Sequence, residues 1–463
     1  MRERKRMTGR WLLIVVLCFG PSVADAACSG SSPTWTAASV SRTDVSDCIT
    51  AASSGDTINV PAGTDTTTWT TSVVLPAGKN LTISGAGSSS TILTCTSTCF
   101  TIRNSTITDL SGFELKNASG SSGSYLLLVR PDKPATGKYF IVHHNKFTKT
   151  GGGYASVDVF GDVDTNCNDS TIIHPSGLFH HNTFTDARVD MNGTACSWGD
   201  GTAQHLLWTQ TPPMGSWPEI VYSEDNSYVA GTGMINMFDS NYGGRYVSRY
   251  NTISGVSGAS GYHEVHGIQG LNRAVQWKEV YRNTYTIPAG AYFGLMYMRS
   301  GSGVIWGNTV STDAQIMRLN NERSYSAPGG APQCDGASNW DGNQTGNGWP
   351  CRDQIGRMKD NSMWTNSGEA YSQDLMPAYF WKNYYTGGTT MIPRRREYRS
   401  TSTTSARTSG CIALIRPRRT RNASPRRRNS RPTMRRGWMR RRRPEWPTSS
   451  SWCWRNICAS SSM

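Results

Sequence analysis

Residues 222–282 contain the densest group of side chains that could perform acid–base or ionic chemistry. The group combines acids, arginines and histidines: Glu224, Asp225, Asp239, Arg245, Arg249, Arg273, Arg282, His263 and His266. In β-elimination from a uronate, a cation neutralises the substrate carboxylate, and an Arg, Lys or His removes the acidified neighbouring proton. In hydrolysis, one carboxyl group acts as an acid and a second as a base. Glu224 and Asp239 could supply that pair.

A repeated segment must position these side chains. Eight segments share an Asn followed, two residues later, by an apolar or aromatic residue. The Asn residues are Asn145, Asn182, Asn226, Asn251, Asn283, Asn308, Asn361 and Asn383. Three of the intervals, of 25, 25 and 22 residues, match one turn of a parallel β-helix. Longer intervals fit a turn with an inserted loop, or two turns.

The repeat predicts a β-solenoid in which each turn contributes a short strand. Three residues before the Asn, six of the eight copies are apolar, and Ser223 and Ser248 are the exceptions. We expect these side chains to point inward and stack from turn to turn. Asn suits the bend after the strand, because it tolerates left-handed backbone and can hydrogen-bond in a ladder.

The residue two before each Asn should then point outward, because side chains alternate along a strand. This outward column is His143, His180, Glu224, Arg249, Tyr281, Trp306, Lys359 and Trp381. Histidines, charges and aromatic rings are what a groove for a sugar chain needs. The sequence thus predicts substrate binding by the column's histidines, aromatic residues and Lys359, together with Arg282. The alternative is that these residues only decorate the surface of the solenoid.

The start of the chain resembles that of a known family. Residues 44–52 can form a short capping helix, and GDTINVPAGT (55–64) and NLTISGAG (80–87) follow it. These segments resemble the opening of pectate-lyase-like proteins, and residues 242–255 and 340–357 resemble a bacterial and phage branch of that superfamily. The resemblance covers roughly residues 35–390. It implies an all-β fold, a single-stranded right-handed parallel β-helix with an N-terminal cap.

The resemblance also suggests a chemistry. Pectate lyases bind Ca²⁺ through clustered carboxylates and use an Arg as the base. By analogy, Glu224, Asp225 and Asp239 would bind Ca²⁺, and Arg249 or Arg245 would be the base. The catalytic set so predicted is completed by His263 and His266. Since one fold hosts several activities, three functions stay open: a polysaccharide lyase, a glycoside hydrolase, and a non-catalytic carbohydrate-binding or adhesin-type solenoid. Elimination on an acidic glycan ranks first.

The N-terminus has the features of a secretory signal peptide over residues 1–26. Five basic residues precede the apolar run 11–20, and Ala24 and Ala26 suit a signal peptidase. The run is shorter than the ~20 residues that span a bilayer, so we expect a secreted or periplasmic protein with a polysaccharide as its partner. Export permits disulfides. Sequence order suggests the pairs Cys28–Cys48, Cys95–Cys99, Cys167–Cys196 and Cys334–Cys351, although eight cysteines allow 105 pairings.

Charge is distributed unevenly. The chain has 47 Lys plus Arg against 32 Asp plus Glu, but residues 394–463 alone hold 20 Arg and two Glu. We interpret 394–463 as a disordered tail or out-of-frame translation, and 27–393 as the β-helix domain. The domain holds 22 basic and 28 acidic residues. A nucleic-acid partner is therefore expected only through the tail. The low charged content also excludes a helical bundle or coiled coil.

Overall fold

The structure is a computed structural model. It describes residues 27–65, 67–103, 107–118, 125–131, 139–149, 157–161, 175–193, 219–230, 236–255, 262–267, 273–286, 294–311, 317–319, 353–360, 373–386 and 412–414.

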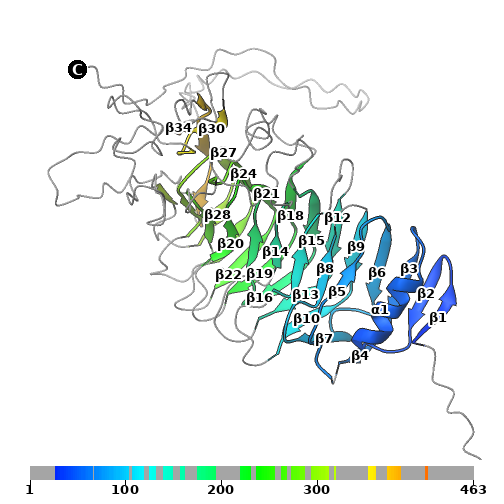
Figure 1. Cartoon of the computed structure of the whole chain (residues 1–463). Helices are drawn as coiled ribbons and strands as arrows, with labels where there is room; N and C mark the ends of the chain where they lie inside the picture. Colours follow the sequence, from blue (N-terminus) through cyan, green and yellow to red (C-terminus); the bar gives the residue numbers. More distant parts are fainter. Residues whose placement is uncertain are drawn as a thin grey trace, which may run out of the picture.

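The described residues form a right-handed parallel β-helix, as predicted. Successive turns place equivalent strands side by side in three long sheets, which Figure 1 shows running from the blue N-terminal end toward the yellow strands. Except for the β1–β2 pair at the N-terminal end of sheet A, neighbouring strands in these sheets are parallel.

Sheet A has thirteen strands. They are β1 (Cys28–Ser31), β2 (Thr34–Ala37), β3 (Thr57–Val60), β6 (Leu81–Gly85), β9 (Thr108–Ser111), β12 (Phe140–His143), β15 (Gly177–His180), β18 (Val221–Glu224), β21 (Arg245–Arg249), β24 (Trp277–Tyr281), β27 (Ser302–Trp306), β32 (Ala378–Trp381) and β34 (Ile412–Leu414).

Sheet B has ten strands. They are β4 (Gly63–Thr64), β7 (Thr91–Cys95), β10 (Glu114–Asn117), β13 (Lys146–Thr148), β16 (Thr183–Thr185), β19 (Ser227–Ala230), β22 (Thr252–Gly255), β25 (Thr284–Thr286), β28 (Thr309–Val310) and β33 (Tyr384–Tyr385).

Sheet C has nine strands. They are β5 (Val73–Leu75), β8 (Phe100–Ile102), β11 (Leu127–Val129), β14 (Val157–Val159), β17 (Val189–Met191), β20 (Asn236–Ser240), β23 (Tyr262–Val265), β26 (Met296–Met298) and β29 (Met317–Leu319).

The core lies inside the solenoid and is built from stacked side chains. Phe147, Phe184 and Tyr228, each two residues after a repeat Asn, are fully buried. Their rings stack with centroids 4.9 Å and 4.5 Å apart. Register sets this stacking, because a shift by one residue would turn every inward side chain outward.

The predicted Asn ladder is present at the turn between sheets A and B. The backbone N–H of Asn145 donates to Oδ1 of Asn182 at 3.0 Å, and the bond recurs up the ladder through Asn226, Asn251, Asn283, Asn308 and Asn383. The left-handed backbone, however, belongs to the residue before the Asn, such as His144 (φ 53°) or Arg282 (φ 55°). The Asn is needed for its buried amide rather than for its backbone.

The seventh copy of the repeat, at Asn361, is not a turn of the β-helix. Asn308 bonds directly to Asn383, and β27 pairs directly with β32. Lys359 lies instead in β30 (Arg357–Asp360), which pairs antiparallel with β31 (Gln373–Leu375) in a separate two-stranded sheet. Asn361 lies outside the described residues. The segment matches the repeat motif in sequence, but it belongs to an insertion between two turns of the β-helix.

This insertion is fastened to the β-helix by a buried ion cluster. The Arg273 guanidinium donates to both carboxyl oxygens of Asp353 and of Asp360, at 2.9–3.1 Å. Gln373 donates to both of the same carboxylates at 2.8 Å. Met358 packs with Val247 and Trp277 of sheet A in a small apolar cluster. The insertion therefore covers part of the outer face of sheet A.

The N-terminal cap is the amphipathic helix α1 (Arg42–Ala51). Ser41 caps it by accepting a hydrogen bond from the backbone N–H of Asp44, and Val45, Cys48 and Ile49 are buried. A disulfide joins Cys48 of α1 to Cys28 of β1, and a second joins Cys95 to Cys99. Both were predicted. The pairs Cys167–Cys196 and Cys334–Cys351 lie outside the described residues.

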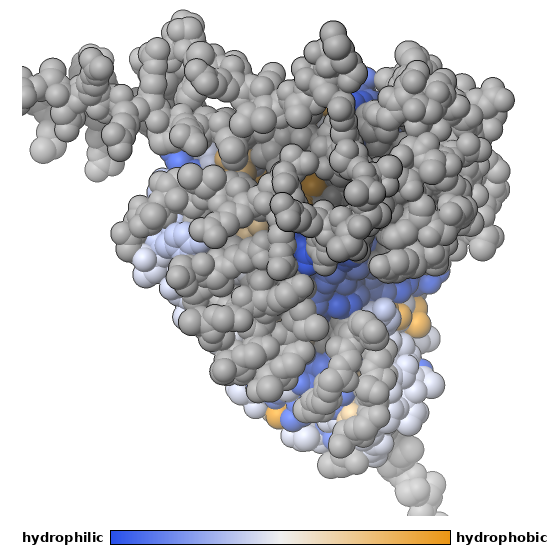
Figure 2. Space-filling model, turned by 90° about the vertical axis from the view of Figure 1, so that its left-hand side faces the viewer, coloured by the Kyte–Doolittle hydropathy of each residue, from blue (hydrophilic) through white to orange (hydrophobic). Residues whose placement is uncertain are grey.

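The predicted signal segment 1–26 also lies outside the described residues, as does segment 394–463 apart from β34, which pairs with β32. Within the described part of the chain, no helix is long and apolar enough to cross a membrane. The described surface visible in Figure 2 is largely hydrophilic, with isolated hydrophobic residues.

Candidate functional site

Four carboxylates stand in one column on the outer side of sheet C. Asp158, Asp190, Asp239 and Glu264 occupy equivalent positions in β14, β17, β20 and β23, and each pairs in register with the next. Adjacent strands lie about 4.8 Å apart, so the column brings carboxylates onto consecutive rungs. The three Asp side chains are buried and Glu264 is half-buried.

Cationic side chains near the strand ends neutralise this column. Arg188 contacts two rungs at once, with Nε 2.8 Å from Asp190 Oδ1 and Nη1 3.3 Å from Asp239 Oδ2. His266 Nε2 lies 2.8 Å from Asp239 Oδ1 and 3.5 Å from Glu264 Oε1. At the two ends of the column, Arg130 forms an ion pair with Asp158 and Arg299 forms one with Glu264.

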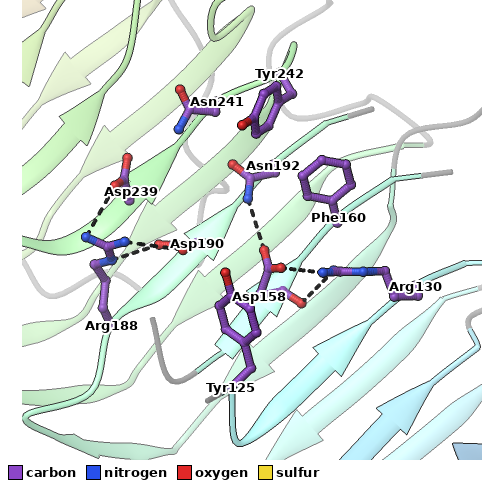
Figure 3. Close-up of a pocket in the computed structure, with 10 residues that line it drawn as sticks. All are labelled: Tyr125, Arg130, Asp158, Phe160, Arg188, Asp190, Asn192, Asp239, Asn241 and Tyr242. Atoms are coloured by element: carbon purple, nitrogen blue, oxygen red, sulfur yellow. Dashed lines mark hydrogen bonds and ion pairs between the residues drawn. The ribbon is translucent and has the colours of Figure 1, made fainter. Parts of the chain in front are cut away.

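A cavity of about 400 Å³ opens on three rungs of the column. Figure 3 shows its lining residues: Tyr125, Arg130, Asp158, Phe160, Arg188, Asp190, Asn192, Asp239, Asn241 and Tyr242. Asn192 donates to Asp158 at 3.0 Å. The Oδ1 atoms of Asn192 and Asn241 are buried without a hydrogen bond among the described residues. Acceptors left unpaired in a polar cavity are positioned to receive hydroxyl groups of a ligand.

The environments of Asp190 and Asp239 shift their pKa values in opposite directions. Burial, with the nearby Asp239 and Asp158, outweighs Arg188 and raises the pKa of Asp190 to about 8. Burial also opposes ionisation of Asp239, but His266 and Arg188 outweigh it and lower the Asp239 pKa. One carboxyl group therefore holds a proton at neutral pH while its neighbour is ionised. Two carboxyl groups whose pKa values are separated in this way serve as acid and base in enzymes.

Asp239, Glu264 and His266 could in principle hold a metal ion, since one ligand atom from each lies within 4.8 Å of the others. The same atoms are already engaged, because Arg188 contacts Asp239 and Arg299 contacts Glu264. A cation would have to displace these guanidinium groups. The donor set thus fits an ion-pair network better than a resident Ca²⁺, which prefers six to eight oxygens.

The predicted outward column on sheet A has the expected geometry, apart from Lys359. Its members pair in register from rung to rung and are half-buried, while the preceding residue of each strand is buried. They are His143, His180, Glu224, Arg249, Tyr281, Trp306 and Trp381.

The aromatic part of this column stacks on itself. The rings of Tyr281 and Trp306 are 5.1 Å apart at 11°, and those of Trp306 and Trp381 are 5.7 Å apart at 10°. The guanidinium of Arg282 also lies 4.9 Å from the Trp306 ring centroid. Because pyranose rings stack on free aromatic faces, a ladder whose faces cover one another is poorly suited to the predicted sugar stacking.

The predicted Ca²⁺ ligands come from different sheets. Glu224 and Asp225 lie at the end of β18 in sheet A, whereas Asp239 lies in sheet C. Glu224 ion-pairs with Arg249, which also donates to the Tyr281 hydroxyl at 2.9 Å. Equivalent positions on two sheets face different sides of the solenoid, so sequence proximity did not bring these acids together.

Two predicted catalytic residues are buried away from the cavity. His263 points inward, stacks on Phe238 with centroids 4.2 Å apart, and has its pKa lowered to about 3 by burial. Arg245 is 4% exposed and donates to Gln276 at 2.6 Å. Of the predicted catalytic set, Asp239 and His266 meet on sheet C, and Glu224 and Arg249 meet on sheet A.

The Asn repeat did not point to Asp158, Asp190 and Glu264. A second periodicity would have found them. An acid between inward-facing residues follows Asn145, Asn226 and Asn251 by 13 residues, giving Asp158, Asp239 and Glu264. The fourth, Asp190, follows its Asn by eight residues because that turn has a shorter connection.

Comparison with known proteins adds little to this geometry. No protein-family model matches the chain, and no curated protein matches it. One similar solved structure is a mutant of a pectin methylesterase in complex with a hexasaccharide. It has 11% sequence identity and a TM-score of 0.28, over 80% of this chain and 94% of that chain. The β-helix assignment therefore depends on the strand pairing of this chain itself.

Proposed function

We propose that this chain is an exported glycoside hydrolase that cleaves a polysaccharide in the sheet C cavity. One observation carries the proposal: Asp190 and Asp239 pair in register on the cavity wall, in surroundings that raise the pKa of Asp190 and lower that of Asp239. The two disulfides and the predicted signal segment support an exported protein.

The chemistry follows from the roles that the pKa values assign. Asp190 donates its proton to the glycosidic oxygen as the bond to the anomeric carbon breaks. Asp239 attacks that carbon and forms a glycosyl ester, which water hydrolyses after Asp190 removes a proton from it. Equivalent residues on adjacent strands have backbones about 4.8 Å apart, which favours the short carboxyl spacing of roughly 5–5.5 Å in retaining enzymes over the 6.5–9.5 Å of inverting ones. We therefore infer retention of anomeric configuration.

Elimination with an arginine base, the mechanism that the resemblance suggests, has less support, because the arginine would have to lose its proton. Contacts with the carboxyl groups of Asp190 and Asp239 outweigh burial and raise the pKa of Arg188. Hydrogen bonds to Tyr281 and Glu224 likewise raise the pKa of Arg249 above that of a free guanidinium. Arg245 has a pKa lowered to about 9 by burial, but Gln276 engages its side chain. Arg188 in the cavity wall, and Arg249 and Arg245 on sheet A, are thus poorly suited to act as a base.

The test is incubation of the full chain with a panel of neutral and uronate polysaccharides. Two readouts are followed: new reducing ends, which either reaction produces, and absorbance of the unsaturated product, which only elimination produces. We expect reducing ends without unsaturated product. Asp190→Asn should lower the rate by about 10²–10⁴-fold, since it removes the general acid.

The matched control is Glu224→Gln, which neutralises a half-buried carboxylate on sheet A. It should keep its activity. Unsaturated product, or activity lost in Glu224→Gln and kept in Asp190→Asn, would contradict the proposal. Binding of a polysaccharide without cleavage would instead support the non-catalytic solenoid.

A further inference from the structure

A second column of side chains runs beside the carboxylate column of sheet C. Its members come two residues after each carboxylate and are Phe160, Asn192, Asn241 and His266. The Gly193 N–H donates to the Asn241 carbonyl at 3.2 Å, so the register of β17 with β20 continues past the ends of the strands. Side chains two residues apart on a strand share a face. Asn192 and Asn241 therefore lie on adjacent rungs, beside Asp190 and Asp239 respectively.

Both asparagines hold an unpaired oxygen in the cavity wall. The Asn192 side chain is buried, and its amide nitrogen donates to Asp158 at 3.0 Å, as Figure 3 shows. This bond fixes the orientation of the amide, since the nitrogen is turned toward the carboxylate. The Oδ1 atoms of Asn192 and Asn241 are buried and have no hydrogen-bond donor among the described residues. A buried acceptor without a donor is destabilising, so it is expected where a ligand supplies the donor.

The cationic side chains of the wall are already paired with carboxylates. Among the described residues that line the cavity, these cations are Arg130 and Arg188. Arg130 forms an ion pair with Asp158. Arg188 contacts both Asp190 and Asp239. A carboxylate on the substrate could gain a guanidinium partner only by displacing one of these ion pairs.

Two tyrosines show that the charges of the wall disfavour a further anion. Burial, followed by the three aspartates of the wall, raises the pKa of Tyr242. Burial also raises the pKa of Tyr125 to about 12, and there Asp158 and Asp190 outweigh the two arginines of the wall. A substrate carboxylate beside these rings would meet the same repulsion.

We propose that Asn192 and Asn241 form a subsite that accepts hydroxyl groups of a neutral sugar, so that the substrate is a neutral glycan and not a uronate. The inference rests on the proposed function, which places the glycan in the sheet C cavity. A neutral sugar supplies hydroxyl donors to both amide oxygens. A uronate would bury its carboxylate near Asp239 without a cation of its own, which is unfavourable. The two amides lie one side-chain position along the strands from Asp190 and Asp239, next to the bond that is cleaved.

The test compares matched pairs of oligosaccharides. Oligosaccharides of glucose, mannose and galactose are each paired with the counterpart that carries a carboxylate at C6, so that the two differ only in this group. Binding is measured by isothermal calorimetry on the full chain with Asp190→Asn, in which cleavage should be slow and the amide keeps the shape of a protonated carboxyl group. We expect a neutral oligosaccharide to bind at least about tenfold more tightly than its uronate counterpart.

Adding Asn241→Leu to this chain tests the subsite, because Leu has a similar shape but offers no hydrogen-bond acceptor. Asn241 is chosen because Asn192 also orients Asp158. The affinity for the neutral oligosaccharide should fall about three- to tenfold, the contribution of one hydrogen bond. The matched control is Asn59→Leu, at a half-buried Asn of β3 in sheet A, and it should leave the affinity unchanged.

Cleavage is followed separately on the unaltered chain as new reducing ends. A neutral oligosaccharide that binds with the expected preference but is not cleaved would support the subsite and refute the hydrolase. Equal or tighter binding of the uronates would overturn the subsite, even if hydrolysis is observed. The subsite is also overturned if no neutral oligosaccharide binds, or if the chain with Asn241→Leu keeps full affinity.

Discussion

Asp190 and Asp239 lie opposite one another on adjacent strands of sheet C and contact the same guanidinium, that of Arg188. Shared contact does not make them equivalent, because His266 lies 2.8 Å from Asp239 and forms no ion pair with Asp190 among the described residues. The extra positive partner keeps Asp239 ionised, and the ionised neighbour helps keep Asp190 protonated. The site thus has an acid and a base made from the same residue type.

The raised pKa of Asp190 predicts a specific pH dependence of folding stability. Between the ordinary Asp pKa of 3.8 and about 8, folded Asp190 holds a proton that the unfolded chain has released. The free energy of unfolding should therefore fall as pH rises through this window, by at most about 1.4 kcal/mol per pH unit from this group. Asp239, whose pKa is lowered, contributes stability that is lost only at pH below 3.8.

Urea unfolding at a series of pH values checks this. Asp190→Asn should reduce the fall in the free energy of unfolding with rising pH. The control is Asp374→Asn, whose side chain is 44% exposed, and it should leave that fall unchanged. Equal slopes for Asp190→Asn and the unaltered chain would show that Asp190 does not hold its proton.

The Asn ladder predicts a large loss of stability at Asn251. Its side chain accepts from the Asn226 N–H at 2.9 Å and donates to the Ser223 carbonyl at 2.9 Å. Asn251→Ala would leave both buried backbone groups unpaired, at about 1–3 kcal/mol each. Thr252→Ala, at the exposed neighbouring residue, should change the free energy of unfolding by less than about 0.5 kcal/mol. Similar denaturation midpoints for the two variants would contradict a stabilising ladder.

The sequence predicted the fold through this ladder. A buried Asn with a stacked aromatic two residues later has a strict geometric cause, so its spacing reports the turns directly. The same logic failed at Lys359, where a six-residue motif matched although the chain belongs to an insertion. The hydrogen bond from Asn308 to Asn383 and the pairing of β27 with β32 show that the insertion adds no turn.

The site was harder to predict, because proximity in sequence differs from proximity in a solenoid. Glu224 and Asp239 are 15 residues apart but belong to different sheets, whereas Asp158 and Asp190, 32 residues apart, are adjacent. His263 and His266 show the same effect in three residues, since the first stacks in the core and the second contacts Asp239. Burial and pKa shifts arise from such contacts and have no local sequence signal.

The Arg273 cluster predicts that the insertion can be detached from sheet A. Arg273→Met would leave the carboxylates of Asp353 and Asp360 buried without their guanidinium, at a cost of about 3–5 kcal/mol. We expect faster limited proteolysis within the insertion. Adding Asp353→Asn and Asp360→Asn should partly restore resistance, because the unpaired charges are removed. Equal cleavage rates in all three proteins would show that the cluster does not fasten the insertion.

The most direct test of the catalytic assignment is the pH dependence of kcat/KM on a polysaccharide that the chain cleaves. The profile should be a bell whose alkaline limb falls near pH 8, as Asp190 loses its proton, and whose acid limb lies below pH 3.8, where Asp239 becomes protonated. An activity that declines between pH 4 and 6, or that stays constant through pH 9, would contradict the assignment of Asp190 as the acid.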